Sequence, residues 1–213
     1  MSPKLHLYHT PGSCSLATHI ALNSASLEFD ATNISAARGF PASHLHLNPK
    51  GRVPILEIDG ELITETPALL ATISALAPEK HLLGEGVMNQ ARAYEWMTWL
   101  SGTMHGQAFG CVFRPARFIK DETMYDVLRE SGRNQAKECF EYVEKKLEGR
   151  NWAVGDTFTL VDAYLLVFYR WGNMLKMEMR DNYPNYARLV DAVTKREDVQ
   201  KTIASEGIST LNE

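Results

Sequence analysis

The chain has 213 residues, of which 45% are hydrophobic and 23% charged, and its formal net charge is −4. This composition is typical of a globular protein with a sizeable core and one or two domains. The negative balance and the absence of a basic run argue against nucleic acid or an anionic membrane surface as the main partner, so we expect a small-molecule ligand.

The apolar part of residues 1–8 is too short for a signal sequence, and no stretch approaches the roughly 18 apolar residues of a membrane-spanning helix. We therefore expect a cytoplasmic protein. The three cysteines, Cys14, Cys111 and Cys139, lie far apart and form no C-x-x-C pair. This spacing favours neither a disulfide framework nor a zinc site, and we expect no metal.

The first third of the chain predicts a small mixed sheet with helices. Residues 4–8 alternate like a half-buried strand and end at Thr10-Pro11-Gly12. A short helix is predicted from Ser15, and a second strand within residues 27–34. This order is a βαβ unit, which typically pairs its strands in parallel.

A hairpin and a helix are predicted next. Residues 53–58 and 61–64 are β-prone runs on either side of Asp59-Gly60, a two-residue turn pair. Residues 68–77 follow Pro67 with helical spacing of apolar residues. The order βαβ-ββα predicts an α/β, thioredoxin-like fold for this part.

After residue 78 the strand pattern ends and only helical periodicity remains. The sequence thus predicts a thioredoxin-like domain over residues 1–78, a linker over 79–87 and an all-helical bundle domain over 88–213. The predicted helices span residues 88–110, 123–147, 159–175 and 184–196.

Thr159-Leu160-Val161-Asp162 has the Ser/Thr-x-x-acid form of a capping box and precedes a strongly apolar run. An acid at the third helical position stabilises the helix start. We therefore assign Asp162 to folding rather than to catalysis.

Cys14 is the first candidate for chemistry, because Ser13-Cys14-Ser15 follows a turn and opens a helix. The N–H groups of a helix start favour the thiolate, so we expect a pKa below that of an ordinary cysteine. The alternative is a buried structural cysteine.

Two further segments have a functional and a structural interpretation. Val53-Pro54 either exposes a strand edge to an extended peptide-like ligand or merely begins a strand. Glu65-Thr66 either binds an amino group and a carboxylate at a helix start or is an ordinary N-cap. Together with Cys14, the functional interpretations describe a site for a small thiol peptide.

His105 lies on a largely apolar predicted helix, where a lone histidine is more often structural than catalytic. The aromatic residues of the helical part belong mostly to the core, although some could line an apolar pocket. As candidates for that pocket we take Phe109, Phe113 and Trp171.

The sequence resembles the bacterial beta-class glutathione transferases in several short segments, which occur in the family's order over nearly the whole chain. The matching segments are Thr10-Pro11-Gly12-Ser13-Cys14-Ser15-Leu16, Asn48-Pro49-Lys50-Gly51-Arg52-Val53-Pro54, Thr64-Glu65, Trp96 with His105, Phe113-Arg114-Pro115 and Phe158-Thr159-Leu160-Val161-Asp162-Ala163-Tyr164.

The resemblance implies that Cys14 contacts the sulfur of glutathione, the co-substrate, and that Pro54 is cis. It implies that Val53, Glu65 and Thr66 hold the tripeptide, that His105 lies near the sulfur, and that the protein is a homodimer. On this basis we take Cys14 and His105 as the catalytic candidates and count Ser13 and Pro54 among the glutathione-binding candidates. The segment 35–46 is shorter than is usual in the class, and its lysine for the glycine carboxylate has no match, so Arg38 is the candidate substitute.

Three functions follow. The first is a glutathione transferase, which promotes attack of the glutathione thiolate on an apolar electrophile and thereby serves detoxification. The second is a glutaredoxin-like reductase that uses Cys14 for mixed-disulfide exchange. The third is a non-enzymatic carrier of apolar ligands.

Overall fold

The computed structural model describes residues 3–36 and 39–209. Its first part is a four-stranded sheet in the order β2-β1-β3-β4. β1 (Leu5–His9) pairs in parallel with β2 (Asp30–Asn33), and the remaining pairs are antiparallel. The hairpin of β3 (Ile55–Ile58) and β4 (Glu61–Thr64) turns at Asp59-Gly60, where both residues have positive φ. The predicted βαβ-ββα order is confirmed.

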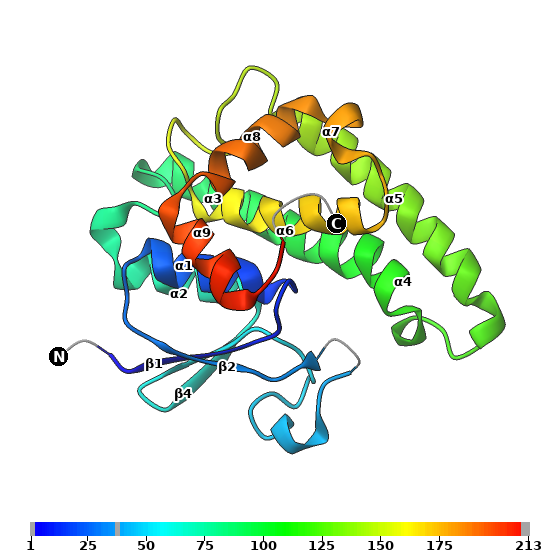
Figure 1. Ribbon diagram of the computed structural model, residues 1–213, viewed down its shortest axis with the longest axis horizontal. Helices are drawn as coiled ribbons and strands as arrows, with labels where there is room; N and C mark the ends of the chain where they lie inside the picture. The colour runs from blue at the N-terminus through cyan, green and yellow to red at the C-terminus, as the bar shows by residue number, and fades with distance from the viewer. Residues whose placement is uncertain (1–2, 37–38, 210–213) are drawn as a thin grey trace.

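Helices α1 (Ser15–Ser24) and α2 (Thr66–Leu76) lie on one face of the sheet, between it and the helical part (Figure 1). A short 3-10 turn, η2 (Ala42–His44), lies between β2 and β3. α1 is buried nearly all round because it packs on the sheet, on α2 and on helices of the second part. Its apolar positions Leu16 and Ile20 are fully buried.

The second part is all-helical (Figure 1). After the 3-10 turn η3 (Pro78–Lys80), one long helix runs without a break through α3 (Gly86–Trp99), the π-helical segment η4 (Leu100–Phe109) and α4 (Gly110–Phe113). The other elements are η5 (Pro115–Arg117), η6 (Glu122–Met124), α5 (Tyr125–Lys146), α6 (Leu160–Met174), α7 (Met179–Asn182), α8 (Pro184–Thr194) and α9 (Glu197–Glu206). The sequence predicted neither the π-helical widening nor α7 and α9.

The predicted capping box begins α6, which lies at the centre of the helical part. Asp162 is fully buried, and its carboxylate accepts hydrogen bonds from the Thr159 N–H at 2.7 Å and from the Ala153 N–H at 2.8 Å. Burial raises the pKa of Asp162 to about 6, although these hydrogen bonds oppose the shift. The carboxylate therefore satisfies two buried backbone donors at the start of a largely buried helix.

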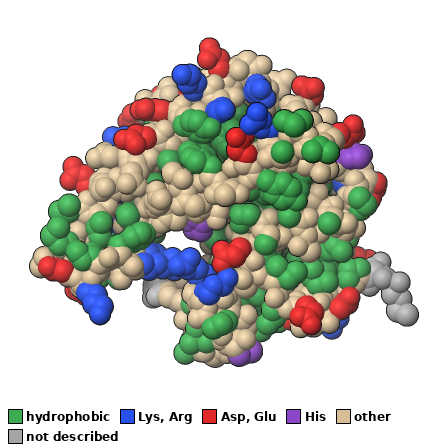
Figure 2. All heavy atoms as spheres, turned by 180° about the vertical axis from the view of Figure 1, so that it is seen from behind, with side chains coloured by type: hydrophobic (Ala, Val, Ile, Leu, Met, Phe, Trp, Pro, Cys, Tyr) green, Lys and Arg blue, Asp and Glu red, His purple; other side chains and the backbone are tan. Residues whose placement is uncertain are grey.

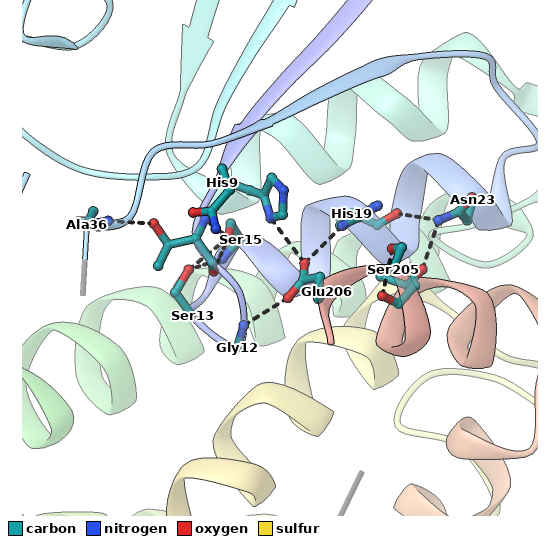
Figure 3. Close-up of polar contacts among 12 residues, drawn as sticks. His9, Gly12, Ser13, Ser15, His19, Asn23, Ala36, Ser205 and Glu206 are labelled. Carbon is teal, nitrogen blue, oxygen red and sulfur yellow. Dashed lines mark hydrogen bonds and ion pairs between the residues drawn. The ribbon is translucent and has the colours of Figure 1, made fainter. Parts of the chain in front are cut away.

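A second buried carboxylate joins the end of α9 to the loop between β1 and α1 (Figure 3). Glu206 accepts hydrogen bonds from the Gly12 N–H at 2.8 Å and from Nδ1 of His19 at 2.9 Å, and Nδ1 of His9 lies 3.4 Å away. Burial raises the pKa of Glu206, but these neighbours outweigh burial and lower it to about 2.

The backbone of Gly12 is held at its carbonyl oxygen as well as at its N–H. Its carbonyl accepts a hydrogen bond from Nε1 of Trp171 on α6 at 3.0 Å. Gly12 has a φ of +69°, and a Cβ there would lie 3.1 Å from Nη1 of Arg170. Only glycine satisfies both conditions without a shift of its neighbours. The loop that carries Cys14 is thus fixed by the helical part.

The hollow between the two parts is visible from behind the view of Figure 1 (Figure 2). One hydrophobic core nevertheless runs through both parts and joins residues of the sheet, α1, α2 and the helical bundle. Among the described residues, no helix is both long and apolar enough to cross a membrane.

We predict that Asp162→Ala lowers the free energy of unfolding by about 3 kcal/mol, because two buried N–H groups lose their acceptor. Urea unfolding at pH 7 measures the loss, with Asp156→Ala in the preceding exposed loop as control. The carboxyl pKa is raised from 3.8 in the reference state to about 6 in the folded state. The contribution of this group to the free energy of unfolding therefore decreases as the pH rises from about 3.8 to about 6. The variant lacks the carboxyl group and should not show this pH dependence. A variant as stable as the wild type would contradict the capping role.

We predict that Glu206→Gln lowers the free energy of unfolding at pH 7 by about 2–3 kcal/mol. The folded-state pKa, about 2, lies below the reference value of 4.5. The stabilisation is therefore complete above the reference value and is lost as the pH falls towards 2. Unfolding curves from pH 7 to pH 2 should show a smaller difference between variant and wild type at the acid end. Glu197→Gln, exposed on the first turn of α9, is the matched control. An unchanged difference across the range would contradict this assignment.

Candidate functional site

A cavity of about 660 Å³ lies between the two parts of the molecule. One wall comes from the β1–α1 loop, the segment before β3 and the start of α2, and the other from η4, α4, η5 and α6. Arg38 lies outside the described residues. All other residues that the sequence predicted for the site line this cavity: Ser13, Cys14, Val53, Pro54, Glu65, Thr66, His105, Phe109, Phe113 and Trp171.

Cys14 directly precedes α1 and is buried, with its Sγ 3.4 Å from the carbonyl oxygen of Val53. The expectation of a lowered pKa is wrong. Burial raises the pKa of the thiol to about 11, although a hydrogen bond from Thr66 and the N–H groups at the helix start oppose it. Loss of hydration outweighs the field of a helix start here, because little water reaches the sulfur. The thiol is neutral at physiological pH.

The hydroxyl of Ser13 is used within the loop. It lies 2.8 Å from Oγ of Ser15 and accepts a hydrogen bond from the Ser15 N–H at 3.2 Å. Oγ of Ser15 donates in turn to the carbonyl oxygen of Thr10 at 3.1 Å. These contacts fix the backbone on which Cys14 is placed.

Val53-Pro54 is a cis peptide bond, as the resemblance implied. The pairing of β3 with both neighbouring strands begins only at Ile55, and β3 lies inside the sheet. Val53 is therefore not on an edge strand, and Pro54 precedes the paired part of β3. The backbone of Val53 nevertheless borders the cavity beside Cys14.

Glu65 lies between β4 and α2 with a φ of 76°, a conformation that is costly for a residue with a side chain. Its carboxylate does not cap α2 but pairs with Nζ of Lys50, which also donates to Oγ1 of Thr64 at 2.7 Å. The N-cap interpretation of the Glu65 side chain is therefore wrong. Thr66 is the first residue of α2 and is buried against the cavity.

The second wall is aromatic and comes from the helical part. The ring of Trp171 lies 5.2 Å from that of His105, 5.1 Å from that of Phe109 and 5.5 Å from that of Phe113, between centroids. Burial lowers the pKa of His105 to about 4, and the positive charges of Arg117 and Arg52 act in the same direction. Its imidazole is therefore neutral at pH 7.

The π-helical segment explains how this wall is built. Ser101, His105, Gly106, Phe109 and Gly110 all line the cavity. The intervals between these five residues are four, one, three and one positions. Residues at such intervals face the same side of a helix whose turns are wider than those of an α-helix. The glycines that recur every fourth residue in this helix were the available sequence signal.

Sequence reasoning also missed three arginines that line the cavity, Arg52, Arg114 and Arg117. They come from three short segments outside the regular elements or at their ends. Arg52 and Arg114 stood in the quoted motifs without a role. The sequence alone carried no sign that they face one cavity.

The structure brings three possible metal ligands together, His9, His19 and Glu206. They come from β1, α1 and α9 (Figure 3), and none of the three lines the cavity. The separation of 2.9 Å between His19 and Glu206 is that of a hydrogen bond, and the second carboxylate oxygen already holds Gly12. These contacts account for the cluster as a structural network.

Comparison with known proteins agrees with this geometry. Residues 3–73 match the family model described as glutathione S-transferase, N-terminal domain, and residues 103–197 match glutathione S-transferase, C-terminal domain. The chain is 31% identical over 210 residues to glutathione S-transferase GST-4.5 of Xanthomonas campestris pv. campestris, which covers 96% of this chain and all of that protein.

Solved structures show the same fold. A glutathione transferase homologue from Sulfitobacter with bound glutathione has a TM-score of 0.89 and 29% identity, over 98% of this chain and 100% of that one. The beta-class enzyme of Sphingomonas chungbukensis has a TM-score of 0.83 and 29% identity, over 96% of this chain and 100% of that one. With both family models matched in order and a relative aligned along almost its full length, the chain belongs to the glutathione S-transferase family and is an enzyme of that kind.

Proposed function

We propose that the enzyme joins the sulfur of glutathione to an electrophilic carbon of a second substrate with an apolar body, inside the cavity between the two parts. The observation that carries this proposal is the asymmetry of the cavity. Backbone groups, a buried thiol and a charged pair form one wall, whereas aromatic rings form the other. A peptide thiol fits the first wall and an apolar electrophile the second.

The first wall offers a partner for each end of glutathione. The carboxylate of Glu65 binds the ammonium group after exchanging Lys50 for it, and the N–H groups at the start of α2, with Thr66, bind the adjacent carboxylate. The backbone of Val53 pairs with the peptide, and Ser13 borders it. Arg38 or Arg52 receives the glycine carboxylate. The exposed Lys50–Glu65 pair supports this exchange, because such pairs are weakly held.

Cys14 serves as a hydrogen-bond donor to the glutathione thiolate. A thiol whose pKa is raised to about 11 keeps its proton at pH 7, so it can donate to a neighbouring anion. Disulfide exchange requires the Cys14 thiolate, and the raised pKa makes that thiolate a minor form at pH 7. Conjugation is favoured over exchange for this reason.

In the reaction, the glutathione thiol loses its proton to water and the sulfur forms a bond with the electrophilic carbon. The leaving group departs with its electron pair. Phe109, Phe113 and Trp171 hold the apolar body, and His105, neutral at pH 7, lies beside the reacting groups. As a neutral imidazole it offers one N–H donor and one nitrogen acceptor to the reacting groups.

We further propose that the enzyme is a cytoplasmic homodimer that detoxifies electrophiles. The three cysteines are free thiols, which suits a reducing compartment. Apolar side chains that remain exposed at the start of α3 and along it, Val87, Met88 and Tyr94, support an interface with a second copy. Light scattering of the purified protein should give the mass of two chains.

We predict that the Cys14 thiol titrates well above 8.5 in the free enzyme, because burial opposes its ionisation. The rate of its alkylation against pH, followed by mass spectrometry of the Cys14 peptide, measures the pKa. The same experiment reports Cys111 and Cys139, which are also buried. A midpoint near or below 7 would contradict the donor role and restore disulfide exchange as a competing activity.

We predict that Glu65→Gln weakens glutathione binding by about 1–2 kcal/mol, or roughly fivefold to thirtyfold. The side chain is 55% exposed, so solvent reduces the effect below that of a buried charge. Titration calorimetry with glutathione measures the affinity, and thermal melts check the fold. Glu61→Gln on the same hairpin, exposed and outside the cavity, is the matched control. Equal affinity in Glu65→Gln and wild type would remove Glu65 from the binding site.

A further inference from the structure

The charge of the cavity is opposite to that of the whole chain. The formal net charge is −4, yet the charged side chains that line the cavity are three arginines and one acid. That acid, Glu65, is already paired with Lys50. Figure 2 shows basic side chains gathered across the hollow, with a histidine behind them. The cavity is therefore a local positive region in an acidic protein.

The arginines act on one another and on the groups around them. Partial loss of hydration lowers the pKa of Arg117, and the charges of Arg52 and Arg114 lower it further. Among the described residues, no carboxylate forms an ion pair with Arg52 or Arg117. The positive charges of Arg52 and Arg117 repel each other and have no ion-paired carboxylate in the described part of the chain, so a bound anion would be favourable beside them.

Glutathione does not account for all of this charge. Under the proposed function, its ammonium and γ-glutamyl carboxylate are bound at Glu65 and Thr66. Its remaining carboxylate requires one cation of the first wall, such as Arg52. Arg117 belongs to the other wall, in the short turn η5 that follows α4.

The surroundings of Arg117 are those of the second substrate. Phe113 and Phe118, on either side of η5, line the same cavity, as does Met174 at the end of α6. Phe118 and Met174 remain 49% and 55% exposed, so this apolar rim is open to an incoming molecule. A guanidinium beside aromatic and thioether groups matches a ligand with an apolar body and a carboxylate.

We propose that the second substrate is an electrophile with an aromatic or other apolar body and a carboxylate, and that Arg117 binds that carboxylate at the mouth of the cavity. This inference rests on the proposed conjugation reaction and narrows its substrate class from apolar compounds to organic acids. Arg117 thereby determines specificity, since it discriminates between an acid and its neutral analogue.

A matched pair of substrates tests the inference. 4-Chloro-3,5-dinitrobenzoate and 4-chloro-3,5-dinitrobenzamide share the ring and the leaving group and differ in charge. In both, the glutathione sulfur bonds to the ring carbon, chloride leaves with the bonding electrons, and the thiol proton passes to water. Rates are divided by the rate with free glutathione, which corrects for intrinsic reactivity. We expect wild type to favour the benzoate in kcat/KM by roughly fivefold to thirtyfold.

In Arg117→Gln most of this preference should disappear, chiefly through a higher KM for the benzoate. The preference of the wild type for the benzoate should also decrease as the salt concentration is raised, because salt screens an exposed charge pair. Arg92→Gln is the matched control, since Arg92 pairs with Glu95 on α3 outside the cavity, and it should keep both the rates and the preference. A wild-type enzyme without preference for the benzoate overturns the inference. An equal loss for both substrates in Arg117→Gln also overturns it, because Arg117 would then serve glutathione or its thiolate.

Binding without turnover separates this inference from the proposed function. Calorimetry with 3,5-dinitrobenzoate and 3,5-dinitrobenzamide, which lack the leaving group, is carried out with S-methylglutathione present. Tighter binding of the benzoate that depends on Arg117 supports the inference, even if the enzyme turns over neither chloro compound. Absence of turnover would then contradict the proposed conjugation reaction but not the binding of the carboxylate by Arg117. Equal binding of the two compounds overturns the inference whatever the rates are.

Discussion

The backbone of Gly12 is the point on which the site depends. Its N–H is held by Glu206 at the end of α9, and its carbonyl oxygen by Trp171 on α6. Both partners belong to the helical part, whereas Cys14 follows Gly12 by two residues. The position of the sulfur is therefore set by the end of the chain as much as by the sheet. Trp171 also lines the cavity, so one side chain fixes the loop and forms the aromatic wall.

Features determined by neighbours in sequence could be predicted from the sequence. The Asp59-Gly60 hairpin and the Thr159–Asp162 capping box depend on residues within a few positions of one another, and both are present. Other features depend on distant partners. Glu206 and His19 are 187 residues apart, and α9, which carries Glu206, was not predicted. Local patterns contain no information about such contacts, so this network became visible only in the folded chain.

The error at Cys14 has the same origin. The field of a helix start is a local property, and it favours a thiolate. Burial is a property of the packed molecule, and here it has the larger effect. Cys14 does line the cavity, but the burial of its sulfur could not be predicted from the sequence. The π-helical segment was also missed, because glycines at every fourth position do not by themselves distinguish a π-helical turn from an α-helical one.

Burial of Cys14 and partial burial of His105 leave the centre of the site uncharged at pH 7, since one is a neutral thiol and the other a neutral imidazole. Neither group carries a positive charge, so neither can form an ion pair with a glutathione thiolate that forms there. Under the proposed function, its charge is stabilised by the hydrogen bond that Cys14 donates and, over a longer distance, by the arginines around the cavity. Loss of hydration is the main reason that His105 stays unprotonated, and the charges of Arg117 and Arg52 act in the same direction. In the proposed mechanism, one set of charges therefore favours the thiolate, helps to keep the histidine neutral and binds the acidic substrate that the thiolate attacks.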